Sequence, residues 1–326
     1  MSVAVTLACG ATDRTLPLFT GAVRPAGIDL TFLPMQPEEV FWRMTRHQEF
    51  DAAEMSLSSY VLRRSRGDDA LVAIPVFPSR AFRHSCVFVR ADAGIAQPTD
   101  LKGKRVGVPE YQMTAAVWIR GFLADDFGMQ PGAMRWFTGG LVQPGREEKL
   151  PISIPGVEIT PIGSSQTLSD MLRQGELDAV IGPRAPAGFD GVRIRRLFED
   201  FRAVEMDYFR RTRIFPIMHT VVIKRALLDR APWVARSLYD AFVAAKALTM
   251  RALSEDVVLS VALPWVLSEL DATRALMGDD YWPYGVASNT ASLEALQRYS
   301  CEQGLAERPV ALEELFAPST LDEFRV

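Results

Sequence analysis

The sequence predicts a two-lobed α/β protein in which each lobe is a doubly wound sheet and two strands form the hinge. A chain of 326 residues is too long for one ordinary core and matches two domains of roughly 100 to 200 residues. Apolar runs of strand length alternate with amphipathic runs from the first residues onward, which is typical of α/β sheets. Two further β-branched apolar segments, 86–90 and 215–224, are candidates for strands that cross between the lobes.

The first lobe is predicted from residues 1–88 and completed by 224–326. Residues 3–9 and 28–33 have the composition of strands, and 37–47 is predicted to be a helix because a proline and two acids occupy its first turn. Residues 49–67 predict a short strand followed by a helix that ends at a glycine. The apolar run 70–77 predicts a third strand.

The second lobe is predicted over residues 89–223. A buried strand at 105–109 precedes a helix at 113–127, in which Ala115, Trp118 and Phe122 repeat at helical spacing. The charged Gly/Pro-rich stretch 141–156 is a surface loop by composition and a candidate lid. Its Arg146 and Glu147 are further candidates for ligand contact, with a mobile charged loop as the alternative.

Later segments predict a helix at 166–175, closed by a glycine, and a strand at 177–183. From residue 226 onward the chain reads as helical, with an apolar stripe that includes Val234, Leu238 and Phe242. We expect this tail to pack back on the first lobe.

Composition and charge restrict the partners. Hydrophobic residues make up 48%, charged residues 23%, and the net charge is −4, so no large basic field is available for nucleic acid. No run approaches the roughly 18 apolar residues of a membrane helix, and the N-terminus reads as a strand and not as a signal peptide. We therefore expect a cytoplasmic protein without a membrane partner. The composition does not decide between a monomer and a homo-oligomer.

Local cation clusters predict a pocket for a small anionic, aromatic molecule between the lobes. Arg80, Arg83 and His84 lie within five residues, between the apolar runs 70–77 and 86–89. Facing them, the strand at 105–109 breaks into a polar turn and a helix start, where unpaired backbone N–H groups favour an anion.

Arginines suit a carboxylate ligand because a guanidinium binds it through two parallel hydrogen bonds and stays charged at neutral pH. Arg80 and Arg83 are the first candidates, with Arg14 and Arg184 in reserve. The alternative for each arginine is a solvated surface ion pair.

His84 is the leading candidate for proton transfer, because histidine titrates near neutrality and this one adjoins the predicted anion site. Its alternative is a hydrogen bond that supports the hinge. His219, inside a predicted buried strand, is the second candidate. Glu54 lies at a strand end and either acts as a base or caps the helix that follows.

Polar side chains at two helix starts would supply hydrogen bonds and an aromatic face to the ligand, although helix capping is an equal alternative. They are Ser58 and Ser59 from the first lobe and Tyr111, Gln112 and Thr114 from the second.

No metal or nucleotide motif stands out. Three dispersed histidines and cysteines at 9, 86 and 301 match no HxH, HxxxH or CxxC spacing. We therefore expect no cofactor. A divalent metal held by His84, His219 and a carboxylate is the alternative. The absence of GxSxG, GxGxxG and P-loop patterns argues against a serine hydrolase and a nucleotide site.

Several long segments resemble the 4,5-dihydroxyphthalate decarboxylase family, and the resemblance extends over essentially the whole chain. The segments are FDAAEMSLSSY (50–60), VFPSRAFRHS (76–85), LKGKRVGVPEYQMTAAVWIRGFL (101–123), PGREEKLP (144–151), FPIMHTVVI (215–223) and DDYWPYGV (279–286).

The resemblance implies a type II periplasmic-binding-protein fold that works in the cytoplasm, in the breakdown of aromatic acids. It implies decarboxylation of a hydroxylated aromatic acid, 4,5-dihydroxyphthalate to protocatechuate, with arginines anchoring the substrate and a histidine and a glutamate moving protons. Because the family shades into transporter components, a non-catalytic binding protein for a small organic anion is the alternative.

One position departs from the family pattern. An acidic residue is expected shortly after WPYG, where this chain has Ala287. If that acid binds or protonates the substrate in relatives, this chain would use another substrate or have lower activity. The alternative is that the acid makes only a surface contact in relatives, which this chain lacks.

Overall fold

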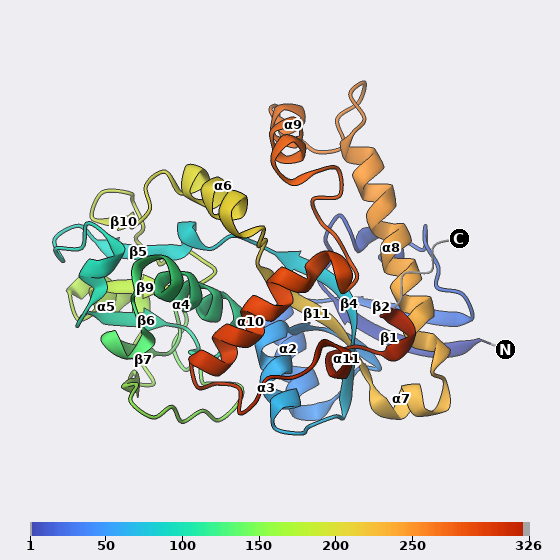
Figure 1. The fold of residues 1–326 in the computed structure, drawn as a ribbon, viewed down its shortest axis with the longest axis horizontal. Coiled ribbons are helices and arrows are strands. Elements are labelled where there is room, and N and C mark those ends of the chain that lie inside the picture. The colour runs from blue at the N-terminus through green and yellow to red at the C-terminus, as the bar shows by residue number, and fades with distance from the viewer. Residues whose placement is uncertain (1, 322–326) are drawn as a thin grey trace.

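The computed structural model describes residues 2–321 and contains two sheets, one in each of two lobes (Figure 1). The strand order is β2-β1-β3-β11-β4 in the first sheet and β10-β5-β9-β6-β7-β8 in the second. Helices flank both sheets, so the predicted two-lobed α/β architecture is confirmed.

The first lobe combines a parallel N-terminal part with an antiparallel strand from late in the chain. Its strands are β1 (Val3–Cys9), β2 (Ile28–Pro34), β3 (Ala52–Ser56), β4 (Leu71–Arg80) and β11 (Ile217–Lys224). β1 pairs in parallel with β2 and β3, whereas β11 runs antiparallel between β3 and β4. The helices near this sheet include α1 (Leu16–Phe19), α2 (Pro37–His47) and α3 (Leu57–Ser65).

The second lobe is mostly parallel, with β5 antiparallel to both of its neighbours. Its strands are β5 (Val87–Arg90), β6 (Arg105–Val108), β7 (Arg135–Thr138), β8 (Ile159–Pro161), β9 (Ala179–Ile181) and β10 (Ile194–Arg196). The helices here are α4 (Thr114–Phe127), α5 (Leu168–Gln174) and α6 (Phe201–Thr212), the last of which leads back toward β11.

Sheet membership places the two crossings at residues 81–86 and 197–216. The whole of β5 belongs to the second sheet and the whole of β11 to the first. Both crossings therefore precede the expected boundaries after residues 88 and 223, because each of these strands continues the hydrogen-bond ladder of its own sheet.

The C-terminal tail contains α7 (Arg225–Arg230), α8 (Trp233–Leu253), α9 (Val266–Met277), α10 (Thr290–Glu302) and α11 (Leu312–Leu315). As expected, α8 lies on the first lobe, against α1 and β4. Contrary to expectation, α10 contacts both lobes, since it packs against α3 and against α4 of the second lobe (Figure 1). The described residues 2–321 include no helix of sufficient length and apolar character to cross a bilayer.

The α4–α10 contact depends on a glycine. The Tyr299 ring lies so close to Gly121 that a Cβ at that position would come within 2.3 Å of it. The Tyr299 hydroxyl also donates to Asp125 of α4 at 2.6 Å. Through α10, the C-terminal tail thus connects the two lobes by noncovalent contacts.

Candidate active site

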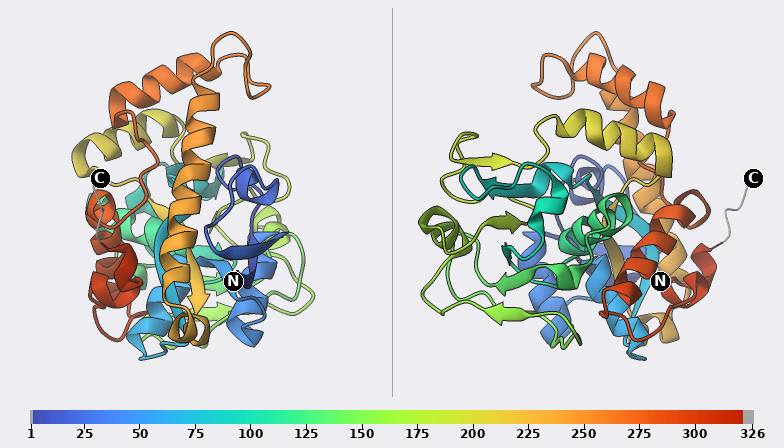
Figure 2. Two further views of the ribbon diagram at one scale, coloured as in Figure 1. Left: turned by 90° about the vertical axis from the view of Figure 1, so that its right-hand side faces the viewer. Right: turned by 60° about the vertical axis from the view of Figure 1, so that its left-hand side comes forward.

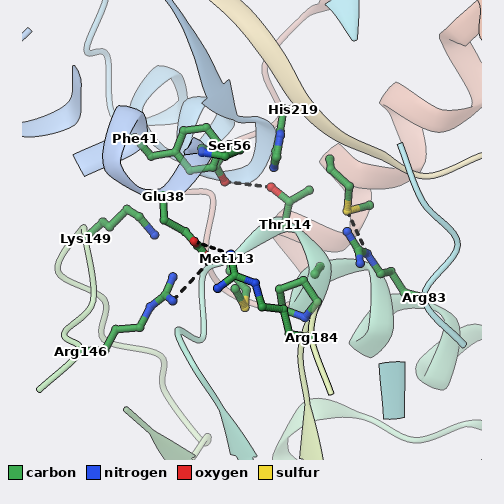
Figure 3. Close-up of a pocket in the computed structure, with 14 residues that line it drawn as sticks. Glu38, Phe41, Ser56, Arg83, Met113, Thr114, Arg146, Lys149, Arg184 and His219 are labelled. Atoms are coloured by element: carbon green, nitrogen blue, oxygen red, sulfur yellow. Dashed lines mark hydrogen bonds and ion pairs between the residues drawn. The ribbon is translucent and has the colours of Figure 1, made fainter. Parts of the chain in front are cut away.

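A cavity of about 220 Å³ opens between the lobes (Figure 3). A cavity of about 150 Å³ is enough to hold benzene, so this one accommodates a single substituted ring. Both lobes contribute to its wall, which consists of Pro37, Glu38, Phe41, Ser56, Arg83, Met113, Thr114, Ala115, Arg146, Lys149, Pro183, Arg184, Met218 and His219.

A histidine–carboxylate pair forms one part of this wall. His219 on β11 lies opposite Ser56 of β3. Because alternate residues of a strand share a face, Glu54, two residues before Ser56, is the diagonal neighbour of His219 on that face. The Nδ1 atom of His219 lies 2.6 Å from the Glu54 carboxylate, which leaves Nε2 as the ring nitrogen available to a bound molecule.

Hydrogen bonds from Cys9 and Gly10 hold Glu54 in place. Its second oxygen accepts the backbone N–H of Gly10 at 2.9 Å and the thiol of Cys9 at 3.4 Å. Burial pushes the pKa of Glu54 upward, but the hydrogen bonds and charge of His219 and the Gly10 N–H outweigh it, so the pKa lies below its usual value. Burial, and next the Glu54 charge, raise the pKa of the Cys9 thiol, which remains a neutral donor.

Arg83 supplies a cation that forms no ion pair within 4 Å among residues 2–321, although its charge acts on Glu205 at longer range. Its hydrogen bonds go to sulfur: Nε contacts Met218 at 3.2 Å and Nη1 contacts Cys86 at 3.7 Å. Sulfur is a weak acceptor. The guanidinium therefore keeps most of its capacity to bind an anionic ligand.

The far side of the cavity is also cationic. Arg146 and Lys149 come from the loop between β7 and β8 and lie across the cavity from Arg83 (Figure 3). Arg146 donates to the buried carboxylate of Glu110 at 2.6 Å, and Lys149 pairs with the same oxygen. The loop predicted as a lid thus forms a wall of the site.

Glu38 links the two lobes at the cavity. It lies in the first turn of α2 and pairs with Arg184 at 2.8 Å and with Arg146 at 3.7 Å. Because both arginines belong to the second lobe, these ion pairs join the lobes beside the ligand space.

Hydroxyl groups between the lobes form the floor. The Ser56 and Thr114 hydroxyls lie 2.9 Å apart. Behind them, Ser58 donates to the Gln112 carbonyl at 2.6 Å and Ser59 to the Gln112 side chain at 2.7 Å. Of the polar residues predicted at helix starts, Thr114 lines the cavity. Ser58, Ser59 and Gln112 do not line it, and their hydrogen bonds join the two lobes.

Arg80 lies outside the cavity, so the expected cluster of three adjacent cationic side chains is not formed. On β4, Ser79 is opposite His219 and Arg80 is opposite Ile217, with an irregularity of the ladder between the two pairs. There Arg80 donates to the carbonyls of Phe215 at 3.1 Å and Pro283 at 2.8 Å, and also to Asn289. Burial lowers its pKa to about 9.

His84, the leading candidate for proton transfer in the sequence, also lies outside the cavity. Its ring stacks on Phe122 with a centroid distance of 4.0 Å and meets the edges of Phe198 and Tyr208. Burial lowers its pKa to about 4, so the imidazole is neutral at pH 7. His84 is therefore part of an aromatic core.

Two other candidates pack elsewhere. Arg14 lies over the Trp282 ring at 4.0 Å and pairs with Asp13. Tyr111 is buried against the Arg120 guanidinium, 3.7 Å from its ring centroid. Ala287, at the start of a short 3-10 turn, is exposed and absent from the cavity wall, which fits the lost surface contact.

The sequence analysis did not single out Glu38 and Lys149. Glu38 was taken only as a favourable charge at a helix start, and Lys149 lies in a loop whose composition favours solvent. No group of three or more His, Cys, Asp or Glu within residues 2–321 is arranged to hold a metal ion, and His84 and His219 do not share a site.

Comparison with known proteins gives a consistent result. A family model described as NMT1/THI5 like matches residues 24–136. A 4,5-dihydroxyphthalate decarboxylase of Comamonas testosteroni is 41% identical over 325 residues, covering 99% of this chain and 98% of that protein. One of Pseudomonas putida is 44% identical over 211 residues, covering 63% of this chain and 81% of the relative.

Solved structures confirm the periplasmic-binding-protein fold. The aliphatic sulphonate-binding protein SsuA of Escherichia coli aligns with a TM-score of 0.55 at 12% identity, covering 98% of this chain and 99% of SsuA. The alkanesulfonate-binding SsuA of Xanthomonas axonopodis pv. citri aligns with a TM-score of 0.50 at 12% identity, covering 98% of each chain. At this identity the likeness concerns the fold alone.

Proposed function

The chain belongs to the 4,5-dihydroxyphthalate decarboxylase family, and on this premise we propose that it converts 4,5-dihydroxyphthalate to protocatechuate and carbon dioxide in the interlobe cavity. The observation that carries the proposal is the His219–Glu54 pair, which faces a cavity of one-ring size with cations at two opposite sides. We place the reaction in the cytoplasm, in the breakdown of aromatic acids, as the family resemblance implies.

The chemistry requires a proton donor at the ring carbon that bears the leaving carboxyl group. Protonation of this carbon interrupts the aromatic ring, and the hydroxyl group para to it stabilises the resulting cation. The bond to the carboxylate then breaks, carbon dioxide leaves, and the electron pair of that bond restores the ring. The substrate ring itself accepts the electrons, so we propose that no cofactor is required.

His219 is the proposed proton donor. Its Nδ1–H is directed to Glu54, and a proton on Nε2 would face the bound ring. The Glu54 carboxylate accepts the Nδ1–H and fixes the ring orientation, as a buried carboxylate does in other histidine pairs. General acid catalysis of this kind contributes roughly 10²- to 10⁴-fold to the rate.

The two cationic sides suit the two ends of the substrate. Arg83 is the proposed anchor for the carboxylate that is retained. Arg146 and Lys149 then face the phenol oxygens and favour loss of the phenol proton, so that the electron-rich phenolate oxygen para to the protonated carbon neutralises the ring cation.

The carboxylate that leaves would lie against the apolar part of the wall, formed by Phe41, Met113, Ala115 and Met218. An apolar wall disfavours a charged carboxylate and tolerates neutral carbon dioxide. Closure of the lobes, supported by the Glu38 ion pairs, would exclude water while the proton is transferred.

The proposal is tested by incubating the purified protein with 4,5-dihydroxyphthalate and measuring carbon dioxide and protocatechuate together. We expect one mole of each per mole of substrate consumed. Tight binding by calorimetry without release of carbon dioxide would contradict the proposal and support a solute-binding protein.

A further inference from the structure

A second cavity lies outside the interlobe site, where α6 and α9 end. Its volume is about 240 Å³. The two helices lie side by side (Figure 2), and Arg202 of α6 pairs with Glu269 of α9 at 3.0 Å. The end of β4, the crossing at 197–216 and the segment 280–292 complete the wall, and none of residues 2–321 lines both cavities. This second space is called the hinge cavity.

Arg80 places a buried positive charge in the wall of the hinge cavity. The residue is 6% exposed and, in the part of the chain that the structure describes, forms no direct ion pair; Asp280 acts on its charge at longer range. Its Nη1 and Nη2 groups donate to Phe215, Pro283 and Asn289, but the buried Nε–H has no hydrogen-bond partner among the described residues. A buried cation whose donors are not all satisfied favours a negatively charged acceptor in the space beside it.

Arg213 supplies a second positive charge to this wall. It directly follows α6, is exposed, and lies over the Phe209 ring, 5.7 Å from the ring centroid. Of the described residues that line the hinge cavity, Asp280 is the one carboxylate. Lys246 neutralises it through hydrogen bonds of 2.7 and 2.9 Å. With Lys246 included, three cations face one carboxylate, so the surroundings favour an anion.

The rest of the wall selects an anion with an aromatic body. Phe209, Phe215 and Tyr281 contribute rings to it, and Met277 contributes a thioether. A cavity of about 150 Å³ holds benzene, so the hinge cavity has room for one ring with a carboxylate. An inorganic anion would leave the apolar part of this wall without a contact. A few polar groups in a mainly apolar wall are the usual composition of a site for a small organic ligand.

We propose that the hinge cavity is a second binding site, which takes a small aromatic monocarboxylate. The carboxylate contacts Arg80 and Arg213, and the ring lies against Phe209 and Phe215. Because Arg213 and Phe215 belong to one of the two crossings between the lobes, the ligand contacts the hinge itself. The site is independent of the proposed decarboxylation, since the two cavities have separate walls.

The test is calorimetric titration with benzoate in an Arg83→Met background, which lacks the proposed anchor of the interlobe cavity. We expect this variant to bind one benzoate per chain. Adding Arg213→Asn should weaken the binding by about tenfold; asparagine suits this position because the backbone φ is 57°. The matched control Arg210→Asn removes another exposed arginine of α6, which does not line the cavity, and should have no effect. Ser288→Trp, which fills the hinge cavity from its exposed edge, should abolish binding.

Crystals of the Arg83→Met variant soaked with 4-bromobenzoate locate the ligand through the anomalous signal of bromine. Bromine in the hinge cavity supports the proposal. Bromine found only elsewhere, equal affinity with and without Arg213→Asn, or inorganic phosphate that binds there as tightly as benzoate would overturn it. If Ser288→Trp does not fold, the comparison of Arg213→Asn with Arg210→Asn still decides the question. No measurement requires release of carbon dioxide, so the outcome does not depend on the proposed function.

Discussion

For a single side chain, the face of the strand from which it leaves decides its surroundings. His219 and Glu54 meet because β11 and β3 are neighbours and both residues lie on the face that looks into the cavity. Arg80 pairs with Ile217 across an irregularity of the β4–β11 ladder, and its guanidinium binds the carbonyls of Phe215 and Pro283 away from the cavity. Two arginines three residues apart thus have different tasks.

The two arginines should differ in their response to substitution. Replacing Arg83 with Met removes the proposed carboxylate anchor, so kcat/KM for 4,5-dihydroxyphthalate should fall by roughly 100-fold with little change in the melting temperature. Replacing Arg80 with Met removes its hydrogen bonds to Phe215, Pro283 and Asn289 and should cost about 2–4 kcal/mol of stability. Steady-state kinetics and urea unfolding of both variants test this. A stable Arg80→Met variant with impaired catalysis would reverse the assignment.

Part of the site could be predicted from residue types and spacing. Arg83, His219, Glu54 and Thr114 were candidates in the sequence, and all four line or support the cavity. His84 was the preferred histidine because it adjoins Arg83 in sequence. Its short 3-10 turn directs the ring into the aromatic core instead. Spacing places a residue along the chain but does not give the direction of its side chain at the end of a strand.

Among the elements, the loop between β7 and β8 has the greatest influence on the site, since it carries Arg146 and Lys149. It is held by Glu148, whose carboxylate accepts the backbone N–H of Tyr111. Burial, and next the neighbouring charge of Glu110, raise the pKa of Glu148 to about 7. Near neutral pH this carboxyl group therefore exists in both protonation states.

The raised pKa of Glu148 makes stability depend on pH. Because the folded pKa lies above that of the unfolded chain, the protonated group contributes fully below the ordinary glutamate pKa, and its contribution is lost as pH rises through about 7. Relative to Glu148→Gln, which does not titrate, the wild type should lose on the order of 2 kcal/mol between pH 5 and pH 8. Urea unfolding at both pH values measures this.

The adjacent exposed residue provides the control for this experiment. Glu147→Gln should follow the wild type at both pH values, because its side chain lies in solvent. A wild type and a Glu148→Gln variant whose stabilities change in parallel from pH 5 to pH 8 would contradict the role of Glu148.

Helices and strands were easier to predict than the loop. The helix predicted at 37–47 is observed as Pro37–His47, because its proline and first-turn acids are local signals. The loop between β7 and β8 gives no such signal. Its cations contact Glu110 and Glu38, which precede it by more than 30 residues in the sequence.

At the scale of the whole molecule, the lobes are joined in several independent ways. The chain crosses twice, the Ser58, Ser59 and Gln112 hydrogen bonds close the floor, and α10 packs on α4. The two-lobed fold could be predicted from length and alternation. The position of α10 could not, because an apolar stripe shows which face of a helix is buried and not what buries it.

The composition of the cavity predicts independence from metal ions. Its anchors for anions are Arg83, Arg146 and Lys149, whose cationic groups have no lone pair to offer a metal. Extended dialysis against EDTA should leave kcat for 4,5-dihydroxyphthalate within twofold of the untreated protein. Loss of activity that added Mg²⁺, Mn²⁺ or Zn²⁺ restores would contradict this expectation.

The most direct test of the account is to separate substrate binding from carbon dioxide release in His219→Asn, with His84→Phe as the matched histidine control. The account predicts that His219→Asn binds 4,5-dihydroxyphthalate with a Kd within a few-fold of the wild type but loses at least about 100-fold in kcat. His84→Phe, which preserves the stack on Phe122, should keep wild-type kcat. A His219→Asn variant that releases carbon dioxide at the wild-type rate would contradict the central claim.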